Sequence, residues 1–476
     1  MSKEPHMLSG GKLLLLAMTC SSALLMEQLD STILISAIPA IAGEFGIAPL
    51  RVNLAVTLYL VTVAAMIPAS AWVADRFGAK RTFLTAICGF MLSSLGAACA
   101  QDLTMLIAMR VLQATFGAMM TPVSRLLLIR GIPREELATA IAWMSMPVLI
   151  GPVLGPLVGG WIVTYSDWRW IFLVNLPVGV LGLFFGWRFL PADGAARTPH
   201  SFDGRGFLLC AFVLAGAQLV LDQLVHPFLP PAVSLTLLAM VPAASLIYVL
   251  HARRHAAPAL DLTLLKLRLF RSAFLTGGLS RLGLNAVPFL LQIQLQLGFG
   301  WSAARAGMTV FAIAAGALVL KPLMRRVLAA FGFRQTLAWN AVLGALFTLA
   351  LARVGPDTAP SLILILVLLY GLTRSLQFNA INTLLYTEVP RERQSASTAL
   401  GGVGQQLSMA LGISLGAVMV AQLQSAGVAP DHRSISIALG LAGGVAALSG
   451  FVFLLTLQDQ DGTVASGHGR RTRKEP

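Results

Sequence analysis

Residues 150–161 read IGPVLGPLVGGW, an apolar stretch without an ionisable side chain. Its first three glycines recur every four residues, so on a helix they form a smooth stripe that a second helix can approach closely. The prolines remove backbone hydrogen bonds and favour bending. The residues concerned are Gly151, Pro152, Gly155, Pro156, Gly159 and Gly160. We expect a membrane helix with a gating role; the alternative is static packing, because small-residue stripes are common in membrane bundles.

The composition of the whole chain places this stretch in a polytopic membrane protein. Of the 476 residues, 57% are apolar and 11% are charged, whereas soluble proteins carry about 25% charge. The 44 glycines follow no Gly-X-Y period, which excludes a collagen-like chain. We therefore expect an all-α integral membrane protein.

Long apolar runs divide the chain into fourteen expected membrane spans, since about 20 residues cross a hydrocarbon core of roughly 30 Å. The expected spans are 13–38, 52–74, 82–100, 103–129, 137–164, 170–187, 206–222, 231–250, 273–298, 306–320, 335–352, 361–386, 396–424 and 434–457. Most lysines and arginines then lie in loops on the side of the termini, and the other loops carry only Arg51, Arg169, Arg305, Arg353 and Arg433. The positive-inside rule predicts cytoplasmic termini and explains the net charge of +14 without a nucleic-acid partner.

Two short motifs occur twice, about 255 residues apart, which indicates an internal duplication. Phe77-Gly78-Ala79-Lys80 is repeated as Phe331-Gly332-Phe333-Arg334, and Pro133-Arg134-Glu135 is repeated as Pro390-Arg391-Glu392. Both pairs follow corresponding spans, so we expect two parallel six-helix bundles with two inserted helices between them. Such halves are typical of alternating-access transporters. The expected divisions are a bundle at 1–190, a linker with two spans at 191–270, a bundle at 271–457 and a basic, disordered cytoplasmic tail at 458–476.

Several motifs together resemble the major facilitator superfamily, in its fourteen-span drug:proton antiporter branch of EmrB/QacA type, with its MdtD-like members. The motifs are Leu29-Asp30-Ser31-Thr32-Ile33 through Pro39, residues 71–80, Arg110-Val111-Leu112-Gln113, residues 150–161 and Trp168-Arg169-Trp170-Ile171-Phe172. Within them, Ala71, Ala79, Ala114 and Phe116 stand where the superfamily usually has other residues. The resemblance covers nearly the whole chain and implies drug efflux across a bacterial inner membrane, with residues 150–161 as the motif associated with antiporters.

The hairpin between the second and third spans is a candidate conformational latch. Asp75, Arg76, Gly78 and Lys80 lie at a helix end on the cytoplasmic side. Glycine permits a tight turn there, and the basic residues can meet anionic lipid headgroups. Such a charged hairpin can hold one helix end against a neighbour; the alternative is plain positive-inside anchoring.

Ionisable side chains inside expected spans are costly and therefore candidate functional residues. Asp30 and Arg110 both fall in the outer half of the membrane by helix rise, so we expect them to face each other or share a polar network. Glu27 lies three residues before Asp30, on nearly the same helix face. We expect one of the two carboxylates to exchange a proton. The alternative is a permanent Asp30–Arg110 bridge with Glu27 facing water.

Further polar and aromatic residues within the spans are candidates for a substrate cavity. They are Gln113, Phe116, Trp143, Arg281, Asn285, Arg374, Asn379 and Asn382. Arginines can instead snorkel to the surface, and aromatic residues more often serve packing. Arg125 is expected at the inner membrane interface, because it lies roughly 33 Å along its span.

The sequence therefore predicts a proton-coupled exporter of amphiphilic compounds that works by alternating access. An exporter of a specific anionic or zwitterionic metabolite is the alternative, because arginines outnumber acids in the spans, and a non-transporting receptor is a more remote one. No catalytic pair, metal motif or phosphate loop is recognisable, so we expect neither an enzyme nor a cofactor, with the proton gradient as the energy source. We expect small amphiphiles, protons and lipids as partners. The sequence does not determine the oligomeric state, and a monomer is one of the alternatives.

Overall fold

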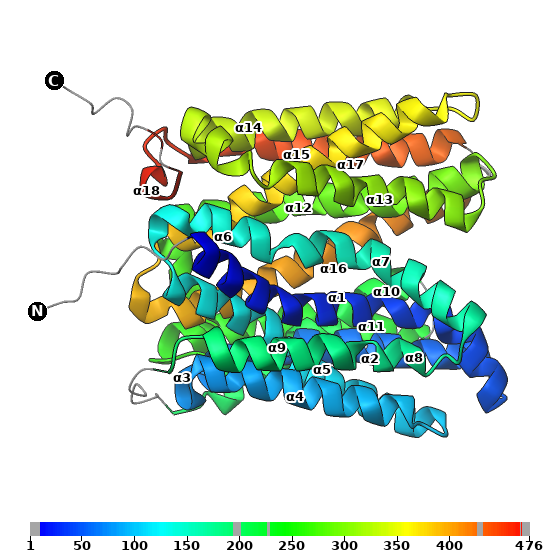
Figure 1. The fold of residues 1–476 in the computed structure, drawn as a ribbon, viewed down its shortest axis with the longest axis horizontal. Helices are drawn as coiled ribbons and strands as arrows, with labels where there is room; N and C mark the ends of the chain where they lie inside the picture. The colour runs from blue at the N-terminus through cyan, green and yellow to red at the C-terminus, as the bar shows by residue number, and fades with distance from the viewer. Residues whose placement is uncertain (1–9, 194–200, 226–228, 426–431, 467, 469–476) are drawn as a thin grey trace, which may run out of the picture.

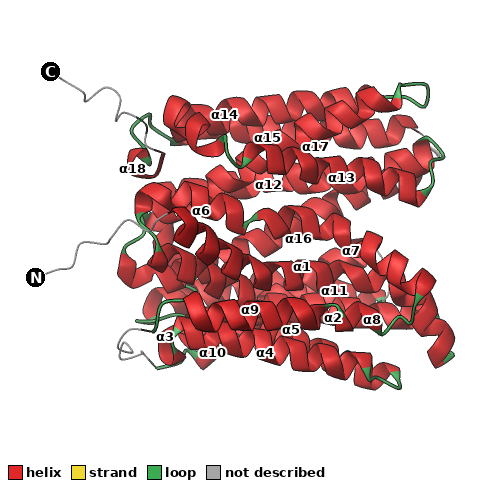
Figure 2. Cartoon of the chain, in the orientation of Figure 1, coloured by secondary structure: helices red, strands yellow, loops and turns green. Residues whose placement is uncertain are grey.

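A computed structural model describes residues 10–193, 201–225, 229–425, 432–466 and 468. Within these ranges every regular element is helical, as Figure 2 shows. Most helices run side by side along the long axis, in two groups (Figure 1). The expected all-α membrane fold is confirmed.

The first group comprises the helices before residue 190. Their bounds are α1 (Gly10–Phe45), α2 (Pro49–Met66), α3 (Ala69–Phe77), α4 (Ala79–Ala98), α5 (Leu103–Gly131), η1 (Arg134–Glu136), α6 (Leu137–Met144), α7 (Met146–Tyr165), α8 (Trp170–Leu173) and α9 (Asn175–Phe189). Phe83, Phe90 and Phe172 are among its largest fully buried side chains. We call this group the first bundle.

The second bundle follows two intervening helices, α10 (Gly204–Val225) and α11 (Pro231–Arg254), and the short η2 (Leu262–Lys266). Its elements are α12 (Arg268–Ile293), η3 (Gln294–Gly298), α13 (Ala303–Leu320), α14 (Met324–Arg353), α15 (Pro360–Thr387), η4 (Arg391–Arg393), α16 (Gln394–Ser425), α17 (His432–Thr456) and α18 (Thr463–Ser466). Helix α10 packs against α2 and α16, while α11 packs against α10 and leaves most of its apolar surface exposed.

Ten helices in the described ranges are long and apolar enough to cross a membrane, or eleven if the bent pair α2–α3 is one span. The chain is thus a multi-pass membrane protein, and the count of fourteen stays a prediction. Two expected spans are broken. The second bends by 60° between α2 and α3 beside Pro68, and the fifth is divided into α6 and α7 at Ser145. Prolines near each break explain it, because they cannot donate a backbone hydrogen bond.

The repeated motifs adopt the same local structure in both bundles. Gly78 and Gly332 both have positive φ, 92° and 66°, which glycine adopts without steric cost. Pro133 (φ −63°, ψ 151°) and Pro390 (φ −62°, ψ 151°) each precede a short 3₁₀ helix, η1 and η4. The duplication inferred from sequence therefore extends to backbone geometry.

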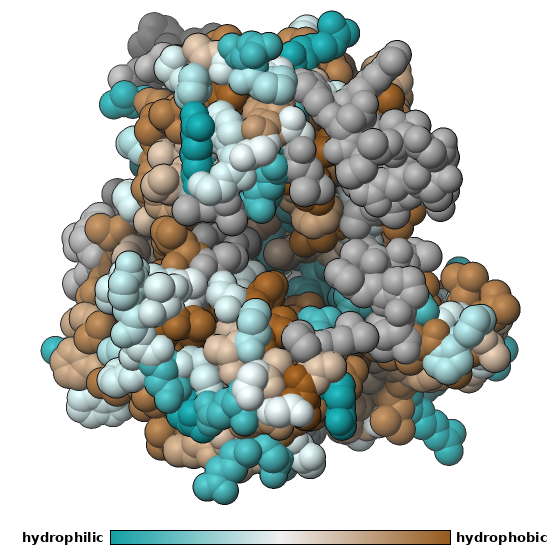
Figure 3. Space-filling view, turned by 90° about the vertical axis from the view of Figure 1, so that its right-hand side faces the viewer, coloured by the Kyte–Doolittle hydropathy of each residue, from teal (hydrophilic) through white to brown (hydrophobic). Residues whose placement is uncertain are grey.

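The bundles meet at the end of the molecule that holds the start of α1 and α18, which we call the terminal end (Figure 1). Several contacts join them there: Arg134 donates to the Val389 carbonyl at 3.2 Å, Arg325 pairs with Glu136 at 3.3 Å, and Lys321 donates to the Ala142 carbonyl. The opposite end is hollowed between the bundles, with hydrophilic residues visible in its depth (Figure 3). The structure is thus closed at the terminal end and open at the other.

The first part of the C-terminal tail differs from the disordered segment that we expected. Asp461 pairs with Arg268, and the backbone turns at Gly462, where φ is 65°. Helix α18 follows and contacts α14 of the second bundle and η1 of the first. Residues 467 and 469–476 lie outside the described ranges. An ion pair with a buried carboxylate and a tight turn therefore order a segment whose composition suggested disorder.

Candidate transport site

Asp30 of α1 and Arg110 of α5 are in direct contact. Arg110 Nη1 donates to Asp30 Oδ2, and both side chains are fully buried. The guanidinium also lies over the ring of Tyr59 from α2, with Cζ 4.0 Å from the ring centroid, which gives a cation–π contact. The structure thus brings together the two residues that the sequence placed at one depth.

Two amides complete the surroundings of the Asp30 carboxylate. Gln113 Nε2 donates to Asp30 Oδ1 at 2.8 Å, and Asn175 Nδ2 donates to the same oxygen at 3.0 Å. Gln113 also donates to Ser94 at 2.7 Å and accepts from Arg110 at 2.6 Å. Gln113, expected in the substrate cavity, belongs instead to this network. Besides the arginine, one amide from α5 and one from α9 therefore donate to the Asp30 carboxylate, and such hydrogen bonds stabilise its ionised form.

Glu27 lies in a different environment, although it is only three residues away. Its side chain is buried, and Oε2 accepts a hydrogen bond of 2.6 Å from the hydroxyl of Thr121. Arg125, one turn further along α5, is near enough to interact with the carboxylate electrostatically. Glu27 therefore accepts from a neutral hydroxyl and has a neighbouring cation, whereas Asp30 has a paired arginine and two amides.

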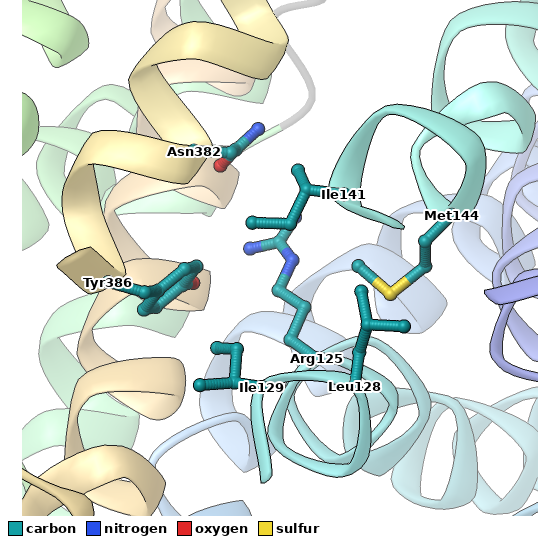
Figure 4. Close-up of a pocket in the computed structure, with 7 residues that line it drawn as sticks. All are labelled: Arg125, Leu128, Ile129, Ile141, Met144, Asn382 and Tyr386. Atoms are coloured by element: carbon teal, nitrogen blue, oxygen red, sulfur yellow. The ribbon is translucent and has the colours of Figure 1, made fainter. Parts of the chain in front are cut away.

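Arg125 is the residue that the sequence placed wrongly. We expected it at the inner interface, but its side chain is 2% exposed and Nη2 donates to Gln405 of α16, across the two bundles. It lines a narrow pocket between α6 and α15 (Figure 4). The pocket is lined by Arg125, Leu128, Ile129, Ile141, Met144, Asn382 and Tyr386. Helix rise predicts the depth of a residue in the membrane, but it does not predict that α5 packs against the second bundle at Arg125.

A second arginine faces this pocket region from α12. Arg281 is 2% exposed, and its Nη2 donates to Asn382 Oδ1 at 3.0 Å. The positive charges of Arg281 and Arg125 act on each other. Both retain a buried nitrogen without a protein partner, Nε of Arg281 and Nη1 of Arg125. Around this pocket the two bundles therefore bring together the arginines Arg125 and Arg281, with Glu27 near the first of them.

The remaining residues of the expected substrate cavity are dispersed. The Phe116 ring packs against Gly89, where an added Cβ would come within 2.5 Å of it. Trp143 is half-buried at the end of α6, and Asn379 donates to the Ser375 carbonyl of its own helix at 2.8 Å. Asn285 packs near Gly412 of α16. Arg374 is half-buried on α15 and is not among the residues that line the pocket.

The expected latch residues make specific contacts at the terminal end. Asp75 accepts from Arg130 at 3.1 Å and from the hydroxyl of Ser395, which belongs to α16 of the second bundle. Lys80 donates to the carbonyls of Trp187 and Leu190, both at 2.8 Å, and thereby caps α9. Asp75 thus joins the two bundles, whereas Lys80 stabilises the first bundle alone.

The turn between α3 and α4 needs glycine at position 78. An added Cβ there would lie 2.3 Å from the carboxylate of Asp193, which accepts from the backbone N–H groups of Lys80 and Arg81 at 2.8 and 3.1 Å. Arg76 is exposed at the end of α3. The acceptor at the start of α4 could not be recognised from sequence, because it lies more than 100 residues further along the chain.

The glycine stripe of α7 packs against α1, the helix that carries Glu27 and Asp30. An added Cβ would lie 2.4 Å from Gln28 at Gly151, 1.9 Å from Thr32 at Gly155 and 2.7 Å from the Ile33 carbonyl at Gly159. Gly160 has open space around it. The close helix contact is confirmed, while the gating role stays a prediction. The side chains of Pro152 and Pro156 lie outside the described part.

At the open end, α1 is tied to the loop between α7 and α8. Arg169 Nη2 lies 2.7 Å from Glu44 Oε1, and Trp168 Nε1 donates to the other oxygen of the same carboxylate. The hydrogen bond to Glu44 raises the pKa of Arg169 above its usual range. Helices α1 and α7 are therefore held together along the stripe and again beyond it.

Comparisons with known proteins agree with this architecture. The family described as Major Facilitator Superfamily matches residues 20–265 and 273–475. A relative from Cronobacter sakazakii designated multidrug resistance protein MdtD is 36% identical over 395 residues, covering 83% of each chain. An Escherichia coli protein with the same designation is 32% identical over 456 residues, covering 94% of this chain and 95% of the relative.

Solved structures show the same fold. The proton:xylose symporter XylE superposes with a TM-score of 0.66 at 12% identity, covering 96% of this chain and 98% of that one. The human organic anion transporter MFSD10 gives a TM-score of 0.64 at 14% identity, covering 93% and 99%. At these identities the likeness concerns the fold alone.

Proposed function

This chain belongs to the major facilitator superfamily, and on that premise we propose that it is a proton-coupled exporter of amphiphilic organic compounds. Its relatives of more than 30% identity are designated multidrug resistance proteins. The exporter would draw energy from the proton gradient and alternate between the present form, closed at the terminal end, and a form closed at the other.

The observation that carries the proposal is the contrast between the two carboxylates of α1. Asp30 is paired with Arg110 and accepts from two amides, so its protonation would leave a buried guanidinium without its counter-charge. Glu27 accepts from a hydroxyl of the first bundle and lies near Arg125, whose side chain reaches across to the second bundle. Protonation there breaks no buried ion pair. We therefore assign proton exchange to Glu27 and a structural role to Asp30.

The charge of the substrate then determines the sign of the coupling. A cationic amphiphile is attracted by ionised Glu27 and loses that attraction when a proton arrives, so the two compete and exchange results. An anion behaves oppositely, because a proton on Glu27 frees Arg125 to attract it. Competition at one carboxylate thus accounts for antiport of cations.

A second candidate function is export of an anionic or zwitterionic metabolite. The observation that favours it is the pair of buried arginines, Arg125 and Arg281, which come from opposite bundles and each keep a nitrogen without a protein partner. An oxyanion between them would neutralise both. Under the preceding argument, such a substrate would carry a proton with it through Glu27 rather than exchange for one.

Flux in proteoliposomes with a pH-sensitive dye inside separates these functions. Cationic, neutral and anionic amphiphiles are supplied in turn, and the direction of proton movement is recorded for each. We expect cations to move protons oppositely to themselves, and Arg281→Gln to lower transport of anions while leaving or raising that of cations. Proton movement in the same direction as the substrate would favour the second function. Asp357→Asn, in an exposed loop, is the control.

A further inference from the structure

A cluster of three metal-ligating side chains lies away from the transport site, where α10 begins and α11 ends. Asp203 precedes α10, His251 lies in the last turn of α11, and His255 follows it directly. The ligand atoms of the three all lie within 4.8 Å of one another. The sequence shows no metal motif here, because 48 residues separate Asp203 from His251.

The distances suit a metal ion between the aspartate and the first histidine. His251 Nε2 lies 2.9 and 3.0 Å from the two oxygens of Asp203. Zinc binds nitrogen and oxygen at about 2.0–2.2 Å, so this separation corresponds to an angle of roughly 90° at the metal. If the distance between His251 Nε2 and the Asp203 oxygen increased by roughly 0.4 Å, the angle at the metal would be tetrahedral.

The second histidine is placed by helix periodicity. Residues 251 and 255 are four apart and so share one face of the helix end. Their rings are stacked, with centroids 5.2 Å apart and planes 28° from parallel. The backbone N–H of Ala257 lies 3.3 Å from Nδ1 of His255. A neutral imidazole has one lone pair, so a metal bound through Nε2 requires the proton on Nδ1, and this long contact from Ala257 must then be given up.

The surroundings orient the ligands as they do in established metal sites. The Asp203 carboxylate accepts from the backbone N–H groups of Gly206 at 2.9 Å and Ala259 at 3.1 Å. Such second contacts fix the carboxylate that binds a metal. The Asp203 side chain is 3% exposed and that of His251 is 23% exposed, so the cluster is anchored on one side and open to solvent on the other.

We propose that Asp203, His251 and His255 bind one divalent transition-metal ion of the zinc class, with solvent completing the coordination. Two imidazoles and a carboxylate are the ligand set that such ions prefer. Arginines 205, 253 and 254 nearby are exposed, so solvent and salt screen their charges. The bound ion would join the start of α10, the end of α11 and the segment that leads into the second bundle. This site is independent of the transport proposal.

The test uses the full chain, purified in detergent without a histidine tag and stripped with a chelator. Zinc alone is added, and bound metal per chain is measured by equilibrium dialysis; cobalt reports coordination through its visible absorption. The variants are His255→Ala and Asp203→Asn. The control is His468→Ala, which removes a histidine that contacts the Ala329 carbonyl elsewhere on the terminal end.

We expect one zinc per chain in the wild type and in the control, and binding weakened at least tenfold in both site variants. His255→Ala keeps the Asp203–His251 pair, so unchanged metal-free unfolding of that variant separates loss of ligation from misfolding. Wild type that binds no more zinc than the double variant His251→Ala/His255→Ala would overturn the proposal. So would equal loss in the control.

Discussion

Replacing Gly155 with alanine tests whether α7 and α1 must approach as closely as the structure shows. The new Cβ would lie 1.9 Å from Thr32 Oγ1, 2.8 Å from Thr32 Cβ and 3.1 Å from the backbone nitrogen of Ile33. Non-bonded carbon atoms prefer about 3.5 Å or more, so the new Cβ and Thr32 Cβ must separate by roughly 0.7 Å even when the hydroxyl turns away. Rotation of Thr32 removes only the first contact. The helices themselves must therefore move apart.

Overpacking of this kind costs about 1–3 kcal/mol of unfolding free energy. Gly160→Ala is the matched control in the same helix, because an added Cβ there meets nothing within 4 Å. Alanine at that position should stabilise the helix by up to about 1 kcal/mol. The same gain applies at Gly155, so denaturant unfolding in detergent should separate the two variants by the overpacking cost alone, roughly 1–3 kcal/mol.

A second comparison identifies the contact. Adding Thr32→Ala to Gly155→Ala removes the nearest atom and should recover part of the loss, so the two changes should not be additive. Transport should fall in Gly155→Ala even in the fraction that folds, since α1 carries the proposed proton site. Equal stability of the Gly155 and Gly160 variants would refute the close contact and, with it, this argument for gating.

Three further predictions concern the ends and the buried network. Ser395→Ala removes the hydrogen bond to Asp75 between the bundles and should shift the population toward a form open at the terminal end, seen as a longer interbundle spin-label distance there. Asn175→Ala removes one donor from the buried aspartate of α1 and should lower the unfolding free energy by about 1–3 kcal/mol; an unchanged value would contradict the network. In a background without native cysteines, Asp357→Cys should react with an impermeant reagent from outside and Arg393→Cys should not, and the reverse would end the proposed orientation.

The sequence predicted the fold and the pairing of its rare buried charges. Asp30 and Arg110 stood out because ionisable residues are scarce in apolar spans, and helix rise placed them at one depth. Asn175 was not predicted as a partner, because neutral amides are common near helix ends and sequence does not give helix rotation. The glycine stripe predicted a close helix contact, but nothing in the sequence identified α1 as the opposing helix.

Arg125 shows where the same reasoning fails. Linear rise along α5 placed it at the membrane interface, where arginines snorkel, but its side chain turns inward to Gln405 of the other bundle. The expected cavity set stays a prediction, and several of its members lie apart because depth was inferred from sequence, whereas the direction of each side chain was not. The contacts of Ser395 and of the C-terminal tail could not be predicted from sequence either, because they depend on how the two bundles meet.

The assignment of proton exchange to Glu27 is tested most directly by counting protons. Wild type, Glu27→Gln and Asp30→Asn are reconstituted in proteoliposomes, and proton movement is recorded when a cationic amphiphile is added. We predict that Glu27→Gln binds the compound more weakly and moves no protons, while Asp30→Asn leaves Arg110 unpaired and loses about 3–5 kcal/mol of stability. Normal proton exchange by a folded Glu27→Gln variant would contradict the account.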